Sequence, residues 1–313
     1  MGTKDLWQSD YFDDKNRFAD VINGAFFQGK QIIKAEELEE MDPKVVHHDK
    51  NDETINIIRD KVYQWKGQPI SVLVLENQSY VDYRMVFRVM LEEAVSYIKQ
   101  QKRAYKKWKE AGYTFADDSN EFLSQMRKGE KYQPVITLIL YLGTNQKWDG
   151  AKYLYEMLNI GDEWKPFVTN HRLNLFDYHE YEDFSFFKTE NRIIFELLSC
   201  ATDESKMEKI IMKNNYLLDR ETIRAIIGML GIKVNIDKIT VNTEEGARYS
   251  MCKAWDDHKE RGRIEEEKEG LVSLVNILST IFNDFETIYN KIVSEKKYSN
   301  VTREQLEQYY CAK

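Results

Sequence analysis

The stretch ISVLVLENQ, residues 70–78, decides how this chain is expected to fold. Its apolar run, bounded by polar groups, predicts a buried strand. Because side chains alternate along a strand, Glu76 and Gln78 would point to the same side of the sheet. Residues 61–69 combine β-formers with a Lys-Gly turn signal, which predicts a hairpin with a preceding strand. Such a hairpin would bring the carboxylate of Asp60 toward Glu76 and Gln78.

This arrangement suits a metal ion. Asp60, Glu76 and the backbone carbonyl of Asn77 would offer Mg²⁺ or Mn²⁺ the oxygen ligands that hard cations prefer. The ion could then acidify a water and neutralise charge on a phosphate, so the pattern predicts metal-assisted phosphodiester cleavage. The spacing also arises by chance in a chain with 53 Asp and Glu residues, so a solvated strand end is the alternative.

Further motifs stand in order from about residue 14 to about residue 270. They are RFADVIN (17–23), FQG (27–29), RD (59–60), LENQS (75–79), DYRMVFR (82–88), PVITLILY (134–141), WDG (148–150), LDRET (218–222) and MCKA (251–254). Together they resemble the recombination-promoting nuclease family, also described as YhgA-like transposases, within the PD-(D/E)XK nuclease superfamily. The resemblance implies a DNA endonuclease connected with recombination or mobile elements.

The resemblance also implies roles for individual residues. Asp60 and Glu76 would bind the metal, and Gln78 stands where the wider superfamily carries lysine. Lysine would place a positive charge beside the attacking water, whereas an amide supplies only hydrogen bonds. We therefore expect weak cleavage or, as the alternative, an inactive DNA-binding or assembly protein that retains the fold. Asp20, on an expected first helix, would be an additional catalytic acid or else a packing residue.

Arg88 has two interpretations. As part of the match at residues 82–88, it would approach a DNA phosphate. It could equally pair with Glu92, one helical turn later.

Composition indicates an ordinary soluble protein. A chain of 313 residues, with 42% hydrophobic and 31% charged residues, has room for more than one domain. No apolar run approaches the roughly 20 residues that a membrane span needs, so we expect no membrane association. Three widely spaced cysteines favour a reducing compartment over a disulfide framework. We therefore expect a cytoplasmic protein.

The net charge of −8 argues mildly against nucleic-acid binding, because phosphate contact needs Lys and Arg. One segment has the opposite balance. This basic cluster consists of Lys99, Lys102, Arg103, Lys106, Lys107 and Lys109, followed by the acid Glu110. Because it follows the helix expected after residue 78, we expect it to lie beside the proposed site and to bind DNA. The alternative is a solvated helix end whose cations complement the helix dipole.

The first part of the chain, residues 1–175, mixes helix and strand patterns. We expect helices near 15–26, 83–108 and from about 117, strands near 55–65, 70–76 and 135–141, and a loop at 42–54. The uninterrupted apolar run at 135–141 predicts a strand buried on both faces. The order predicts an α/β fold in which helices flank a central mixed sheet, as in the PD-(D/E)XK core that the resemblance implies.

The remaining chain is expected to be mostly helical, because strand patterns nearly vanish after Asp183. We expect a helical domain at 176–250, with helices near 193–202, 205–214 and 222–230, and then charged and terminal helices at 251–313. Apolar residues recur at three- and four-residue steps from Leu271 to Ile292, which predicts one long helix. This helix would pack on its own domain or form the seam of a homodimer. The sequence Thr302-Arg303-Glu304-Gln305 resembles a capping box.

Overall fold

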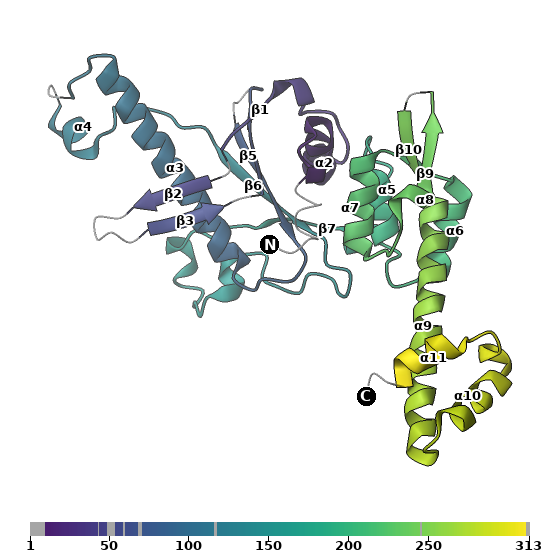
Figure 1. Cartoon of the computed structure of the whole chain (residues 1–313). Coiled ribbons are helices and arrows are strands. Elements are labelled where there is room, and N and C mark those ends of the chain that lie inside the picture. The colour runs from purple at the N-terminus through teal and green to yellow at the C-terminus, as the bar shows by residue number, and fades with distance from the viewer. Residues whose placement is uncertain are drawn as a thin grey trace. The chain divides into compact units, whose positions relative to one another are not determined.

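The computed structural model describes residues 10–42, 44–48, 54–58, 60–67, 71–115, 118–244 and 246–310, without the side chains of 44–48, 54–58 and Ser71. The chain divides into two compact units (Figure 1). Unit 1 contains Met1–Lys213 and Asp219–Gly231, and unit 2 contains Asn214–Leu218 and Ile232–Lys313. The expected boundary near residue 175 falls within a strand of unit 1, β7 (Asn174–Asp177).

Unit 1 is built on a five-stranded mixed sheet with the order β1-β4-β5-β6-β7 (Figure 1). The other strands are β1 (Leu38–Glu40), β4 (Lys61–Trp65), β5 (Ser71–Gln78) and β6 (Val135–Tyr141). β1, β4 and β5 pair antiparallel, whereas β5, β6 and β7 pair parallel. The expectation of an α/β fold with a mixed sheet is thus confirmed, and both apolar runs, 70–76 and 135–141, form its central strands.

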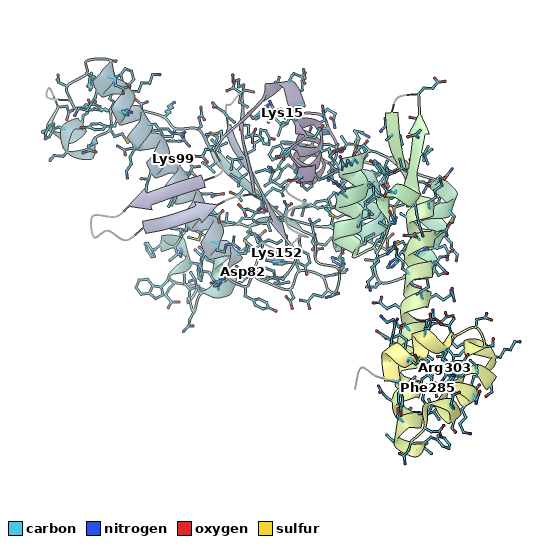
Figure 2. All side chains as sticks on the ribbon, viewed as in Figure 1. Lys15, Asp82, Lys99, Lys152, Phe285 and Arg303 are labelled. Carbon is cyan, nitrogen blue, oxygen red and sulfur yellow. The ribbon has the colours of Figure 1, made fainter. Side chains whose placement is uncertain are left out.

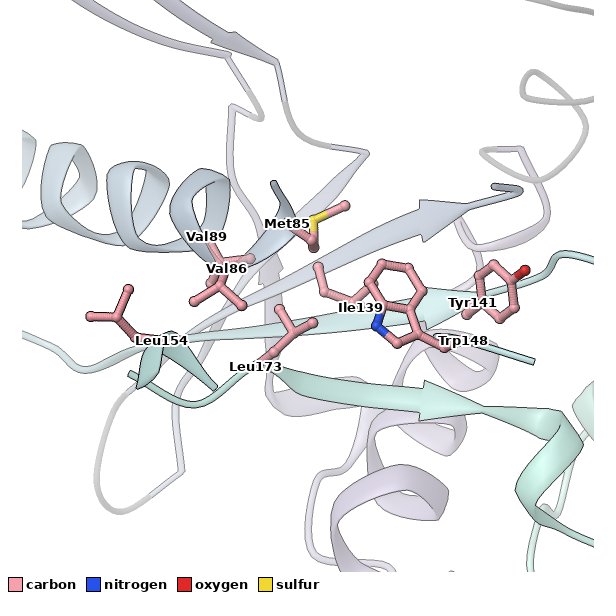
Figure 3. Packing of buried hydrophobic residues seen from close by; sticks show 8 residues of the cluster. All are labelled: Met85, Val86, Val89, Ile139, Tyr141, Trp148, Leu154 and Leu173. Carbon is pink, nitrogen blue, oxygen red and sulfur yellow. The ribbon is translucent and has the colours of Figure 1, made fainter. Parts of the chain in front are cut away.

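One face of the sheet, the α3 face, packs against helix α3 (Met85–Glu110). Met85, Val86 and Val89 from the start of α3 contact Ile139 and Tyr141 of β6 (Figure 3). Ile139 pairs with Glu76 and Tyr141 pairs with Gln78 in the β5–β6 register. Since paired residues project to the same side, Glu76 and Gln78 lie on the α3 face.

The opposite face, the α2 face, is covered by α2 (Lys15–Phe27) and α5 (Asn191–Leu198). The rings of Phe18 in α2 and Tyr63 in β4 lie 4.4 Å apart, and those of Phe195 in α5 and Phe176 in β7 lie 5.2 Å apart. Tyr63 pairs with Leu73, so the odd-numbered residues of β5 project toward α2. The sheet is therefore buried between helices on both faces.

The antiparallel pairing of β4 with β5 is confirmed, but the strand expected at 55–65 is wrong in its bounds. The expected strand 55–65 is two strands, β3 (Thr54–Ile58) and β4, and β3 pairs antiparallel with β2 (Lys44–His48) in a separate ribbon. The expected loop 42–54 is wrong over β2. Its β-branched pair, Val45 and Val46, favours a strand despite the polar residues around it.

Helix α3 extends well beyond the sheet. Its 26 residues span about 39 Å, whereas the eight residues of β5 span about 26 Å. Because β5 and β6 are parallel, α3 must run from the end of β5 back past its beginning. The chain then turns through α4 (Ser119–Ser124), capped by Asp118, before β6 (Figure 1).

The rest of unit 1 is mainly helical and short. It contains α6 (Glu204–Asn214), α7 (Arg220–Leu230), η1 (Ala35–Glu37), η2 (Leu154–Met157), η3 (Lys165–Phe167) and η4 (Tyr178–Glu180). The helices expected near 193–202, 205–214 and 222–230 correspond to α5, α6 and α7.

Unit 2 contains strands that the sequence analysis did not predict. An antiparallel sheet has the order β8-β10-β9, from β8 (Leu217–Leu218), β9 (Thr240–Thr243) and β10 (Gly246–Ser250). Strands of two to five residues are too short to show a clear alternation. The helical elements are α8 (Ile236–Ile239), α9 (Met251–Ile281), α10 (Phe285–Ser294), η5 (Lys296–Tyr298) and α11 (Arg303–Tyr310).

The expected helix from Leu271 to Ile292 is wrong, because α9 ends at Ile281 and Asp284 caps α10 by accepting a hydrogen bond from the Thr287 N–H. The two helices and α11 fold against each other. Their apolar side chains form one cluster within the chain: Leu271, Val275, Ile288, Ile292 and Leu306. These side chains are covered within a single copy, and the homodimer stays a prediction.

The end of unit 2 agrees with its prediction. Thr302 and Gln305 exchange two hydrogen bonds, Thr302 N–H to Gln305 Oε1 at 3.1 Å and Gln305 N–H to Thr302 Oγ1 at 3.3 Å, which form the capping box of α11. Figure 2 shows Arg303, at the start of α11, beside Phe285 of α10. None of the helices among the described residues has an apolar stretch long enough to cross a lipid bilayer.

Candidate active site at the carboxyl edge of the sheet

Asp60 and Glu76 come together from neighbouring strands. Lys61 of β4 lies opposite Leu75 of β5, and continuing this register by one residue places Asp60 opposite Glu76. Opposite residues of antiparallel strands project to the same face, so both carboxylates lie on the α3 face. The backbone N–H of Asn77 donates to Oδ2 of Asp60 at 2.7 Å, which fixes this carboxylate beside the end of β5.

Gln78 lies two residues after Glu76 on β5 and projects to the same face of the sheet. Glu76 is 3% exposed and Gln78 is 7% exposed, and both follow Val74 on the α3 face. The parallel strands β5, β6 and β7 end at Gln78, Tyr141 and Asp177. We call the end of the sheet marked by these three residues the carboxyl edge. Ligands of open sheets with parallel strands commonly bind at such an edge.

The backbone of Asn77 contributes to the same place. Its N–H points toward Asp60, and the N–H and C=O of one strand residue point to the same side. The neighbouring Gln78 carbonyl accepts from the Leu142 N–H at 2.7 Å and so points the other way, toward β6. The Asn77 carbonyl therefore faces the same side of β5 as Asp60.

These donors fit one kind of metal site. Two carboxylates and one carbonyl suit Mg²⁺, which keeps several waters and takes substrate oxygens as further ligands. Within the described ranges, no group of three or more His, Cys, Asp or Glu residues could hold a metal ion. Asp60, Glu76 and the Asn77 carbonyl could therefore supply only part of the ligands of such an ion.

Asp20 is not brought to this site. It lies on α2, which covers the other face of the sheet, and it is 2% exposed. Its carboxylate accepts hydrogen bonds from the Lys188 and Thr189 N–H groups, the Thr189 hydroxyl and the Asn191 amide. Asp20 thus ties α2 to the start of α5, in agreement with the packing interpretation and not with a position beside Glu76.

Two matched motifs far apart in sequence meet next to Asp20. Arg17 donates to Asp219 at 2.5 Å and to Thr222 at 3.1 Å, which joins α2 to the start of α7. Burial opposes the charge of Asp219, but hydrogen bonds from Thr222 and the charge of Arg17 lower its pKa. The segments RFADVIN and LDRET therefore contact each other and hold α2 against the start of α7. Their separation along the chain gave no sign of this contact.

Arg88 is engaged by acids. It lies 3.2 Å from Asp82 and 3.9 Å from Glu92, so the predicted pairing one turn later is confirmed. Burial would raise the pKa of Asp82, but hydrogen bonds from Arg84 and Arg88 outweigh it and lower that pKa. In this arrangement the Arg88 guanidinium pairs most closely with Asp82, although the Arg88 side chain is partly exposed.

The basic cluster does not lie beside the site. Lys99 is 14 residues after Met85, which is about 21 Å along α3, and the rest of the cluster is farther from the carboxyl edge. Figure 2 shows Asp82 and Lys99 well separated along this part of unit 1. The expectation of adjacency is wrong because α3 runs away from the carboxyl edge and past the other end of β5.

The basic cluster occupies one side of α3. Trp108 lies about 180° around the helix from Lys99 and packs toward the returning chain, where Glu130 accepts from its indole N–H and Arg127 stacks 4.1 Å from its ring. Lys102, Arg103, Lys106, Lys107 and Lys109 are exposed. Lys106 pairs with Glu110 at 3.7 Å. Arg127 and Glu130 thus pack against the side of α3 that faces away from the exposed cations.

A second polar group, which was not predicted from the sequence, lies at the carboxyl edge. Asp177 accepts from the Trp148 N–H at 2.8 Å, and its other oxygen lies 2.6 Å from Nδ1 of His179. Trp148 packs edge-on against Tyr141 (Figure 3), and burial, followed by the charge of Asp177, raises the pKa of Tyr141. An Asp-x-His sequence directly after a strand was the available indication.

Comparison of the chain with protein families, with curated proteins and with solved structures finds no match. The resemblance to the recombination-promoting nucleases is therefore carried only by the motifs quoted above. It stays a prediction, and so do the roles that it implies.

Proposed function

We propose that this chain is a metal-dependent endonuclease that hydrolyses phosphodiester bonds in DNA. The observation that carries the proposal is the register that sets Asp60 opposite Glu76, with Gln78 next on the same face. Two acids at the end of a central strand pair offer the oxygen ligands that a hard cation prefers. The resemblance to the recombination-promoting nucleases adds the substrate, DNA, and a connection with recombination or mobile elements.

Each residue at the edge has a role in this proposal. Asp60, Glu76 and the Asn77 carbonyl would hold Mg²⁺ or Mn²⁺, which when bound neutralises phosphate charge and makes water more acidic. The Gln78 amide orients the attacking water or a phosphate oxygen by hydrogen bonding. It brings no charge, so we expect slower hydrolysis than a lysine at this position would support.

The position of the basic cluster suits a DNA duplex that lies along α3. Its residues from Lys99 to Lys107 lie about 21 to 33 Å from the start of the helix, and one turn of B-DNA is about 34 Å long. A duplex of at least one turn could contact both the carboxyl edge and the basic cluster. Shorter duplexes should bind more weakly, because they reach fewer of these cations.

A second candidate is a non-catalytic DNA-binding or assembly protein. The glutamine at position 78, which brings no charge to the candidate site, favours it. In that case DNA would be retained through the basic cluster, and the paired acids would have no substrate.

Plasmid nicking separates the two candidates. Supercoiled DNA is incubated with the chain in Mg²⁺ and in Mn²⁺, and the isosteric variants Asp60→Asn and Glu76→Gln are compared with Glu182→Gln, which alters an exposed carboxylate. The nuclease proposal expects nicking by the parent chain and by Glu182→Gln, and none by the other two variants. DNA retention without nicking in either metal supports the second candidate, and equal nicking by all variants rejects Asp60 and Glu76 as ligands.

A further inference from the structure

Asp177 and His179 form a tightly held pair at the end of β7. Asp177 is 1% exposed, and both of its carboxylate oxygens are used. One accepts from the Trp148 N–H at 2.8 Å. The other accepts from the His179 backbone N–H at 3.0 Å and lies 2.6 Å from the ring nitrogen Nδ1. This carboxylate cannot turn away without breaking contacts to two segments.

The pair sets the chemistry of the imidazole ring. A carboxylate only accepts hydrogen bonds, so it holds a proton on Nδ1 and leaves Nε2 as the reactive nitrogen. No described residue forms a hydrogen bond with Nε2, and the His179 side chain remains 18% exposed. Tyr178 stacks on the ring at 4.1 Å, and the Tyr141 ring lies 6.0 Å away. The imidazole is thus held through Nδ1, and its side chain keeps partial exposure.

The position of the pair relative to the candidate site follows from the sheet. Gln78 pairs with Tyr141, and Tyr141 pairs with Asp177, so the three form one row on the α3 face. Neighbouring strands are about 4.8 Å apart, which separates the Gln78 and Asp177 backbones by about 10 Å. Asp60 directly precedes β4 and lies on the other side of β5. A phosphate at Gln78 would therefore have Asp60 toward one side of β5 and His179 toward the other, with Glu76 two residues earlier on β5 itself.

We propose that His179 is the general acid that protonates the leaving oxygen in DNA hydrolysis, with Asp177 as its positioning residue. This inference rests on the proposed nuclease function. In phosphoryl transfer the attacking and leaving oxygens are roughly in line on opposite sides of phosphorus. Water oriented on the Asp60 side of β5 therefore leaves the departing oxygen on the His179 side.

The proposed step is balanced. The water oxygen bonds to phosphorus and releases one proton to solvent, while the bond from phosphorus to the leaving oxygen breaks. The proton on Nε2 of the imidazolium moves to that oxygen, and the neutral ring regains a proton from solvent. The buried Asp177 carboxylate holds the ring in place during the transfer.

A change of leaving atom tests the proton transfer. His179→Asn keeps an N–H near the position of Nδ1 for Asp177 but removes Nε2. On ordinary DNA we expect a loss of about 100-fold, as general acid catalysis contributes at least this much. On DNA whose leaving oxygen is replaced by sulfur, a thiolate departs without protonation, and the loss should fall to about threefold or less. A similar loss on both substrates would overturn the proposal, because a structural defect would affect both alike.

Nitrogen NMR provides a readout that does not depend on cleavage. In Glu76→Gln protein with labelled histidines, His179 is assigned by comparison with the His179→Asn spectrum. We expect a proton on Nδ1, lost in Asp177→Asn, and a shift of Nε2 when a short DNA duplex is added. An unchanged Nε2 overturns the role of His179 even if the parent chain nicks plasmid. If the Nε2 signal shifts but the parent chain never nicks DNA, the contact of His179 with phosphate is supported. In that case only the nuclease proposal is rejected.

Discussion

Asp20 provides the sharpest separation between a catalytic and a structural role. It is buried on the α2 face, and its carboxylate accepts four hydrogen bonds from residues 188–191. Asp20→Asn can keep an oxygen for the three donors at Oδ2, from Thr189 and Asn191. Its new NH₂ group would then face the Lys188 N–H, which loses its acceptor.

The expected cost follows from these contacts. One buried donor left without an acceptor costs about 1–3 kcal/mol, so we expect Asp20→Asn to destabilise unit 1 by this amount. Asp20→Ala removes the acceptor for all four donors, and partial relaxation should limit the loss to about 3–5 kcal/mol. The control Asp162→Asn alters a carboxylate on the surface and should leave unfolding nearly unchanged.

Urea unfolding measures these differences. With a typical slope of about 1–3 kcal/mol per molar urea, Asp20→Asn should lower the midpoint by about 1 M at an unchanged slope. Nicking per folded molecule should equal that of the parent chain. A variant with full stability but no nicking would refute the structural assignment and return Asp20 to the catalytic group.

Three further outcomes follow from the same structure. Replacing both Lys102 and Lys106 by Gln should reduce the salt dependence of DNA binding by about 1.8 logarithmic units per decade of salt, if each neutralises one phosphate; an unchanged slope in a titration would place DNA elsewhere. Asp284→Ala should lower the melting temperature of unit 2, while Asp284→Ser, which retains a cap, should not. The pKa of Asp219 is lowered in the folded chain, so its contribution is present above the unfolded pKa of about 3.9 and is lost on acidification through the folded value. Urea unfolding of Asp219→Asn should therefore depend less steeply on pH below about 4, and an equal dependence would contradict the Arg17 pairing.

The candidate site was partly accessible from sequence. A strand alternates its side chains whatever surrounds it, so Glu76 and Gln78 had to share a face once residues 71–78 formed β5. The hairpin pattern then placed Asp60 near Glu76, because short connections join neighbouring antiparallel strands. By contrast, the Asp177–His179 pair becomes prominent only when parallel pairing brings the end of β7 beside Tyr141.

Local patterns determined β5, β6, α2, α3 and the capping box at Thr302, because each depends on the period or spacing of nearby residues. Tertiary structure alone decided three other points. It placed Asp20 on the face opposite Glu76, it carried the basic cluster away from the carboxyl edge, and it folded α9 onto α10. These outcomes depend on which elements pack together and on how far α3 extends beyond β5. Residue periodicity contains no such information, since the same apolar stripe can face a sheet, a neighbouring helix or a second copy of the chain.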